Sequence, residues 1–239
     1  MRYPVAPGSR RRARQDLVIV GAGGFGRETA EAVRAAGARW RLLGFLDDNP
    51  ALHGTQVDGV PVLGPADAVH DLPRAQVVLC TVNPRVYTSR SDLADRLRLP
   101  DDRYATVVHP SAQVARRAEV GHGSVLLAQA VVTARAEIGA HVAVMPQTVL
   151  THDTEVAELV TLASGVRLGG GVRLARGCYL GAGALVREFT KVGEWSLVGM
   201  GSVVLHDVPP QEVWAGAPAR FLRAAAGTAA RAGSAAAPS

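Results

Sequence analysis

A six-residue repeat of aliphatic side chains dominates the second half of the chain. Stepping by six from Val108, seventeen consecutive positions are aliphatic, and the residue four positions after each of them is small or β-branched. Alternate residues of a strand face the same side, so both sets are predicted to point inward, with one short strand and one corner per hexad. Stacked hexads then form a solenoid in which each repeat contacts its neighbours. The aliphatic positions are Val108, Val114, Val120, Leu126, Val132, Ile138, Val144, Leu150, Val156, Leu162, Leu168, Leu174, Leu180, Val186, Val192, Val198 and Val204.

The pattern before residue 107 is different, because short apolar runs alternate with helical segments. Strands are predicted at 17–20, 41–46, 60–63 and 77–82, with helices at 27–36 and from Pro84 to about Leu97. This order is typical of a small Rossmann-like parallel βαβ domain. The predicted fold class is therefore α/β plus all-β, with the α/β domain at 16–106 and the solenoid at 107–223. The ends, 1–15 and 224–239, are expected to be disordered tails.

Charge and composition narrow the function classes. The net charge is +5, and the first fifteen residues hold five arginines and no acid, so the remainder is close to neutral. We interpret the basic segment as a solvated tail, with a phosphate or membrane contact as the less favoured alternative, and expect no nucleic-acid partner. No apolar run suits a signal peptide or a membrane span, and two isolated cysteines suit a reducing cytoplasm.

A glycine-rich turn marks a candidate ligand site in the first domain. The segment from Gly21 to Gly26 matches G-x-G-x-x-G between a predicted strand and a predicted helix, where backbone amides can approach a phosphate. Asp47 follows Gly26 by twenty-one residues, near the place of a ribose-binding acid. Alone, this motif suggests a dinucleotide, but about ninety residues are few for a complete NAD domain. A turn kept for packing is the other alternative.

His152 is the candidate general base of the solenoid. An imidazole titrates near neutrality and suits the deprotonation of a nucleophile in acyl transfer. The next residue, Asp153, offers a carboxylate that can orient the ring. A hydrogen-bonding surface histidine is the alternative.

The hexads together with these motifs resemble the hexapeptide-repeat acyltransferases. The order of motifs is similar to that of sugar acetyltransferases of the sialic-acid O-acetyltransferase type and of the enzymes that acetylate UDP-4-amino sugars. The motifs are, in chain order, the turn Gly21-Ala22-Gly23-Gly24, the segment Gly44-Phe45-Leu46-Asp47-Asp48, the segment Thr151-His152-Asp153 and the closing segment Gly216-Ala217-Pro218-Ala219-Arg220. The resemblance covers residues 16–223. It implies a left-handed parallel β-helix of three hexads per coil, a homotrimer, and acetyl-CoA as a co-substrate without a tightly bound cofactor.

The resemblance also implies a set of site residues. His152 and Asp153 would be the catalytic base and its partner, and Gly170, one coil later, would donate a backbone N–H to the thioester carbonyl. A nucleotide-linked amino sugar would bind at Gly21, Gly23, Gly24, Phe25, Gly26, Asp47, Asp48 and Asn83. Acyl-CoA would bind between subunits at Thr161, Gly170, Gly199, Gly201, Ala217, Pro218 and Arg220.

Two positions depart from the family pattern. Many relatives carry Asn where this chain has Met145, and a second His where it has Thr161. The departures keep open an unusual acceptor, such as O-acetylation of a free sugar or polysaccharide precursor, and a non-catalytic trimeric nucleotide-sugar-binding protein. No metal site is expected, because the zinc-binding relatives need two histidines five residues apart and no such pair occurs here.

Overall fold

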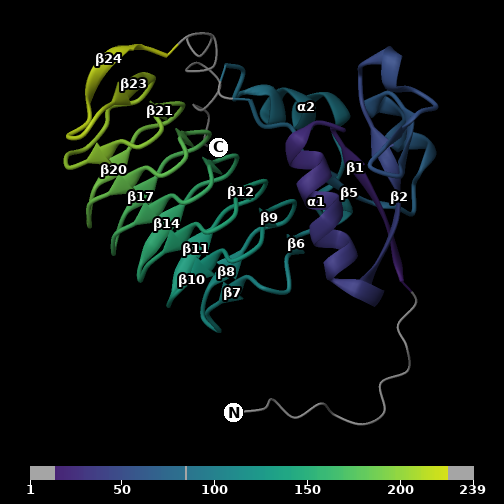
Figure 1. Cartoon of the computed structure of the whole chain (residues 1–239), viewed down its shortest axis with the longest axis horizontal. Coiled ribbons are helices and arrows are strands. Elements are labelled where there is room, and N and C mark those ends of the chain that lie inside the picture. Colours follow the sequence, from purple (N-terminus) through teal and green to yellow (C-terminus); the bar gives the residue numbers. More distant parts are fainter. Residues whose placement is uncertain (1–13, 84, 226–239) are drawn as a thin grey trace, which may run out of the picture.

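The computed structural model describes residues 14–83 and 85–225, which form an α/β unit followed by a solenoid (Figure 1). The two tails that were expected to be disordered lie outside the described residues, apart from Arg14, Gln15, Ala224 and Ala225. None of the helices in the described part of the chain has the length and apolar character needed to cross a bilayer.

The α/β unit is built on a five-stranded sheet with the order β3-β4-β2-β1-β5. All neighbouring pairs are parallel except β3 with β4. Its strands are β1 (Gln15–Val20), β2 (Trp40–Leu46), β3 (Gln56–Val57), β4 (Val60–Gly64) and β5 (Gln76–Leu79). Its helices are α1 (Gly24–Ala35) and α2 (Ser89–Leu97), with short 3-10 helices at Gly37–Arg39, Pro50–Leu52, Ala66–Asp71 and Asp101–Arg103. The parallel βαβ prediction is confirmed.

Helix α1 begins earlier than its predicted first residue, Arg27. It starts at Gly24, so the second half of the glycine motif forms the first helical turn. Gly26 needs to be glycine here, because a Cβ on it would lie 1.9 Å from the carbonyl oxygen of Gly21. The helix buries Phe25, Ala30 and Val33 on one face, and this face sets its position.

The solenoid consists of three parallel sheets whose strands are mostly two residues long. The first sheet has the order β22-β19-β16-β13-β10-β7, the second β20-β17-β14-β11-β8, and the third β24-β23-β21-β18-β15-β12-β9-β6. The strand bounds are β6 (Val107–Val108), β7 (Gln113–Val114), β8 (Glu119–Val120), β9 (Val125–Leu126), β10 (Val131–Val132), β11 (Ala136–Ile138), β12 (Ala143–Val144), β13 (Val149–Leu150), β14 (Thr154–Val156), β15 (Thr161–Leu162), β16 (Arg167–Leu168), β17 (Arg173–Leu174), β18 (Tyr179–Leu180), β19 (Leu185–Val186), β20 (Lys191–Val192), β21 (Leu197–Val198), β22 (Val203–Val204), β23 (Glu212–Ala215) and β24 (Arg220–Ala224).

The register of the solenoid follows the hexads. Paired residues are eighteen apart along the chain, as in Val131 with Val149 and Val149 with Arg167, so three hexads make one coil. All seventeen predicted aliphatic positions belong to one core. Fourteen are buried, whereas Val108, Val114 and Val120 are partly exposed, because they lie in the first coil and have no coil beneath them.

A second core joins the two units. Figure 1 shows α1 lying between the α/β sheet and the first strands of the solenoid. Phe25 and Val33 of α1 share this core with Val107, Val125 and Ala143 of the third solenoid sheet. The α/β unit therefore packs on the outer face of that sheet, through apolar side chains at its early coils.

The far end of the solenoid is closed by two longer strands. β23 continues the parallel sheet after β21, and β24 then pairs with β23 in the antiparallel direction. The last strand carries Arg220 and Arg223 and is exposed along its length.

Candidate active site

His152 and Asp153 occupy the corner between β13 and β14. His152 Nδ1 lies 3.0 Å from Asp153 Oδ2, and both side chains are exposed. A proton on Nδ1 donates to the carboxylate, which leaves Nε2 with the lone pair that a base needs. Asp153 has φ of 57°, a left-handed conformation that Asp tolerates better than most residues. The pair is thus oriented by the corner itself.

Gly170 lies directly against the ring of His152. A Cβ built on Gly170 would lie 2.3 Å from His152 Cε1 and 2.4 Å from Nε2, so any side chain there would overlap the ring. The neighbouring Gly171 donates its N–H to the carbonyl oxygen of His152 at 2.9 Å, which fixes the stacking. In the described part of the chain, no backbone carbonyl accepts the Gly170 N–H. Gly170 is itself buried beside the imidazole, and its N–H is the candidate oxyanion donor.

The coils on either side complete the corner. Asp153 donates its N–H to the carbonyl oxygen of Arg135 at 2.7 Å, and a cavity of about 130 Å³ is lined by both residues together with Glu137 and Glu155. On the other side, the ring of Phe189 lies over Gly171 and is 73% exposed. The catalytic candidates thus sit on an open ridge to which a ligand or a second protein surface has access.

The glycine-rich turn borders a cavity of about 280 Å³ in the α/β unit. Its lining is Gly21, Gly23, Gly24, Phe25, Asp47, Cys80, Thr81, Val82, Asn83, Val86 and Ser89. Gly21 has φ of 107°, and a Cβ on it would lie 2.7 Å from the carbonyl oxygen of Cys80. Helix α1 opens at this cavity, so its first amides and its dipole favour a negatively charged group.

The three polar candidates of this unit have different surroundings. Asp47 lines the cavity, but its carboxylate accepts the N–H groups of Ala22 and Asn49 at 2.8 and 2.9 Å and so braces the turn. Asn83 also lines the cavity. Asp48 does not line it: Asp48 accepts from Ala66 N–H and pairs with Arg96 at 2.7 Å. These partners hold the Asp48 side chain away from the cavity lining, and its contact with the nucleotide sugar stays a prediction.

The residues expected to bind acyl-CoA fall into two groups. Gly201, Ala217, Pro218 and Arg220 are exposed and Gly199 is half-buried, all near the closing strands of the solenoid. Thr161 is instead 3% exposed, and its hydroxyl accepts a hydrogen bond of 2.9 Å from Arg90. The Thr161 side chain is thus enclosed between the two units of the chain, and its assignment to the acyl-CoA site stays a prediction.

Neither cysteine has the character of a nucleophile. Burial raises the pKa of the Cys80 thiol to about 12 and raises the pKa of the Cys178 thiol further. Within the ranges that the structure describes, no group of three His, Cys, Asp or Glu side chains is arranged to hold a metal ion. The corner of His152 is therefore the best-formed candidate centre for acyl transfer.

Comparisons with known proteins find relatives that share this fold. Residues 16–82 match the PglD N-terminal domain family. The acetyltransferase domain of PglB from Neisseria gonorrhoeae, solved in complex with acetyl coenzyme A, is 31% identical, with a TM-score of 0.78 over 87% of this chain and 100% of that domain. The chain belongs to the PglD-type hexapeptide-repeat acetyltransferases. PerB from Caulobacter crescentus, solved with CoA and GDP-perosamine, is 26% identical, with a TM-score of 0.77 over 92% of this chain and 100% of that one.

A further relative of this PglD-type chain is the UDP-N-acetylbacillosamine N-acetyltransferase of Bacillus subtilis. It is 36% identical over 116 residues, which is 48% of this chain. The match spans about half, 52%, of the Bacillus protein.

Sequence reasoning missed one buried side chain of this PglD-type acetyltransferase. Arg90 on α2 is 2% exposed and donates to groups of both units. The sequence did not indicate the burial of this side chain, because an arginine in a short polar helix is typical of a solvated surface residue. Met145, which replaces the Asn of many relatives, packs against the core shared by the two units.

Proposed function

We propose that this protein is an acetyl-CoA-dependent N-acetyltransferase that acts on an amino sugar linked to a nucleotide. The observation that carries the proposal is the His152–Asp153 pair, whose imidazole lies against Gly170, a residue whose N–H has no backbone acceptor among the described residues. The known activities of the Bacillus relative and the ligands of the Neisseria and Caulobacter relatives support it.

The chemistry is a direct attack of the sugar amine on the thioester. Nε2 of His152 takes a proton from the amine as the new C–N bond forms, and the developing oxyanion is stabilised by the Gly170 N–H. Collapse of the tetrahedral intermediate breaks the C–S bond, and the thiolate of CoA receives the proton from the imidazolium. Asp153 stabilises that imidazolium through Nδ1. No acyl-enzyme is required, which agrees with the two buried cysteines.

The nucleotide part of the acceptor is proposed to occupy the 280 Å³ cavity, with its diphosphate at the glycine-rich turn and the N-terminus of α1. Acetyl-CoA is proposed to lie along the solenoid toward Gly199, Gly201, Ala217, Pro218 and Arg220. The residues that line the cavity do not include the His152 corner. We therefore propose a homotrimer in which neighbouring copies complete the site, working in the cytoplasm, where both thiols stay reduced.

The test follows release of free CoA thiol from acetyl-CoA with UDP-N-acetylbacillosamine, GDP-perosamine or a free sugar as acceptor. We expect turnover with a nucleotide-linked amino sugar. Substitution His152→Ala should lower kcat by about 10²–10⁴-fold, the usual contribution of a general base. Asp153→Asn should have a smaller effect of the same sign, since it removes charge and leaves the base.

The control is His109→Gln, which removes another histidine of the solenoid, one whose ring contacts only Ser111 among its hydrogen-bond partners in the described chain. It should leave kcat unchanged. Turnover with the free sugar alone, or with no acceptor, would contradict the proposed substrate class. Near-wild-type turnover of the His152 variant would remove this corner from the mechanism.

A further inference from the structure

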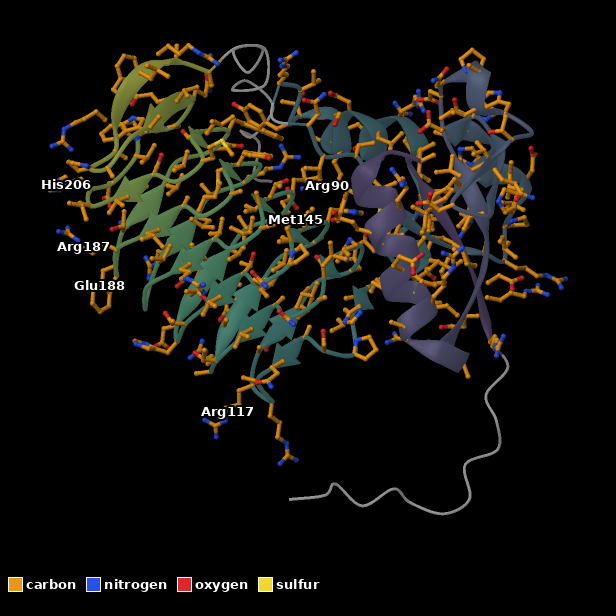
Figure 2. All side chains as sticks on the ribbon, viewed as in Figure 1. Arg90, Arg117, Met145, Arg187, Glu188 and His206 are labelled. Carbon is orange, nitrogen blue, oxygen red and sulfur yellow. The ribbon has the colours of Figure 1, made fainter. Side chains whose placement is uncertain are left out.

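Arg90 is a fully buried cation at the boundary between the two units of the chain. It lies in the first turn of α2 and is 2% exposed. Figure 2 shows Arg90 where the helices of the α/β unit meet the solenoid. Its guanidinium is therefore placed to bond to both sides at once.

The hydrogen bonds of Arg90 cross this boundary. Nη1 donates to the carbonyl oxygen of Thr81 at 3.2 Å, within the α/β unit. Nη2 donates to the carbonyl oxygens of Leu159 and Val160 at 2.8 and 3.1 Å, and to the Thr161 hydroxyl at 2.9 Å, all in the solenoid. One planar group thus fixes the separation between a strand end of one unit and a corner of the other.

The charge of Arg90 has no acidic partner. In residues 14–83 and 85–225, no carboxylate forms an ion pair with it, and burial lowers the pKa of the guanidinium to about 10. It therefore stays protonated at neutral pH, solvated only by carbonyl and hydroxyl dipoles. A buried charge without a counter-charge costs free energy, and an apolar side chain of similar volume would satisfy packing more favourably. The four hydrogen bonds of the guanidinium offset part of this cost, and they join groups of both units.

These hydrogen bonds reach one wall of the cavity. Thr81, Val82, Asn83, Val86 and Ser89 all line it, on the segment that leads into α2. Arg90 holds the start of this segment through the Thr81 carbonyl, and it forms the segment's other end itself. The glycine-rich turn lines the same cavity, so this guanidinium links part of the cavity lining to the solenoid, in addition to the apolar core that joins the two units.

We propose that Arg90 is a positioning residue that fixes the nucleotide-binding wall, formed by Thr81, Val82, Asn83, Val86 and Ser89, on the solenoid, so that the sugar of a bound nucleotide is presented in register for acetyl transfer. This inference rests on the proposed function. It assigns to Thr161 a role as an acceptor of this contact. It also assigns to the first turn of α2 a role in acceptor binding, separate from donor binding.

The experiment compares wild-type protein with R90M, which keeps an unbranched, flexible side chain and removes the charge and the fork. The control is Tyr87→Phe, which removes the other hydrogen bond across the same boundary, from Tyr87 Oη to the Trp195 carbonyl oxygen at 2.7 Å, and leaves Arg90 in place. Steady-state assays vary acetyl-CoA and either UDP-N-acetylbacillosamine or GDP-perosamine. Calorimetric titrations with UDP and GDP report nucleotide binding without turnover.

In R90M we expect the KM for the nucleotide sugar and the Kd for the preferred nucleotide to rise at least about tenfold, with the KM for acetyl-CoA changed less than about twofold. Tyr87→Phe should leave all three nearly unchanged. Unchanged nucleotide affinity in folded R90M, or equal shifts in both KM values, would overturn the inference. If R90M fails to fold, R90K serves in its place, since it keeps the charge and loses the fork, and the same split is expected. Wild-type protein that binds a nucleotide but acetylates no amino sugar would refute the proposed function, and the titrations would still decide the role of Arg90.

Discussion

At the scale of single residues, the corner that carries His152 depends on the eighteen-residue stacking of the solenoid. Arg135, Asp153, Gly171 and Phe189 are eighteen residues apart, and the last three all adopt positive φ. The same backbone conformation recurs at this corner in successive coils, whereas the side chain differs from coil to coil. The imidazole therefore meets a glycine on the next coil, a contact that its flanking residues in sequence could not provide.

Gly170 gives a direct test of that contact. Its backbone does not adopt positive φ, so Gly170→Ala should fold, but the new Cβ would displace the exposed His152 ring from Asp153. We expect kcat to fall at least tenfold, with a melting temperature within a few degrees of wild type. In a double-mutant cycle with His152→Ala, Gly170→Ala should have almost no further effect on kcat. Additive losses would mean that the glycine acts independently of the ring.

His141 predicts a pH dependence of stability. It is 8% exposed, and burial, with smaller contributions from His122 and Arg90, lowers its pKa to about 4. Below the unfolded pKa near 6.5 the unfolded chain binds the extra proton first, so stability is complete above pH 6.5 and is lost as the pH falls toward 4. The loss should be on the order of 3 kcal/mol.

Urea unfolding between pH 4.5 and 7 measures this slope. His141 has φ of 54°, and Asn adopts that conformation readily without titrating, so His141→Asn is the matched variant. Its free energy of unfolding should change less with pH over this interval than that of wild type. Equal slopes would assign the pH dependence to other groups.

The residues of the candidate site differ in how far the sequence could predict them. His152 and Asp153 are neighbours in sequence and Gly170 follows His152 by one coil of eighteen residues, so their proximity could be predicted, whereas their proposed roles came from the family resemblance. The surroundings of Asp48 and Thr161 could not be predicted, since their side chains bind partners distant in sequence, Arg96 and Arg90. The spacing of a motif predicts where a backbone position lies, but it does not predict which neighbouring residue binds the side chain.

At the scale of elements, the two halves of the chain were unequally predictable. In the solenoid every hexad buries the same positions, so the hydrophobic register alone gave the strands. In the α/β unit the start of α1 was placed three residues late, because glycines disfavour helix, whereas Gly24 and Gly26 lie in its first turn on either side of the buried Phe25. The two-residue strand β3 carries no periodic signal and was not predicted.

The solenoid core should be weaker at its first coil than in its middle. Val198 is fully buried, whereas Val114 is partly exposed on the first coil. We expect Val198→Ala to cost roughly 2–3 kcal/mol through lost burial and a residual cavity. Val114→Ala should cost about 1 kcal/mol or less, since water can fill the space. Denaturant unfolding at one protein concentration compares the two, and equal losses would show that the first coil is covered in solution.

At the scale of the whole molecule, the cavity and the His152 corner belong to different units joined by an apolar core. An active site that uses both the cavity and the His152 corner needs residues other than those that line the cavity. This is why we propose assembly of three copies. Light scattering should give a mass of about three times that of the chain. An active monomer would contradict the proposed shared site, and dilution below the assembly concentration should abolish thiol release.

The antiparallel strand β24 has a consequence for solubility. A parallel solenoid that simply stopped would present a row of free N–H and C=O groups, on which the first coil of another molecule could add in register. β24 runs antiparallel at that edge, so its strand direction does not suit parallel pairing with an incoming coil. It also carries Arg220 and Arg223, which place two positive charges at the edge. Deleting the strand should convert a discrete particle into one capable of end-to-end polymerisation.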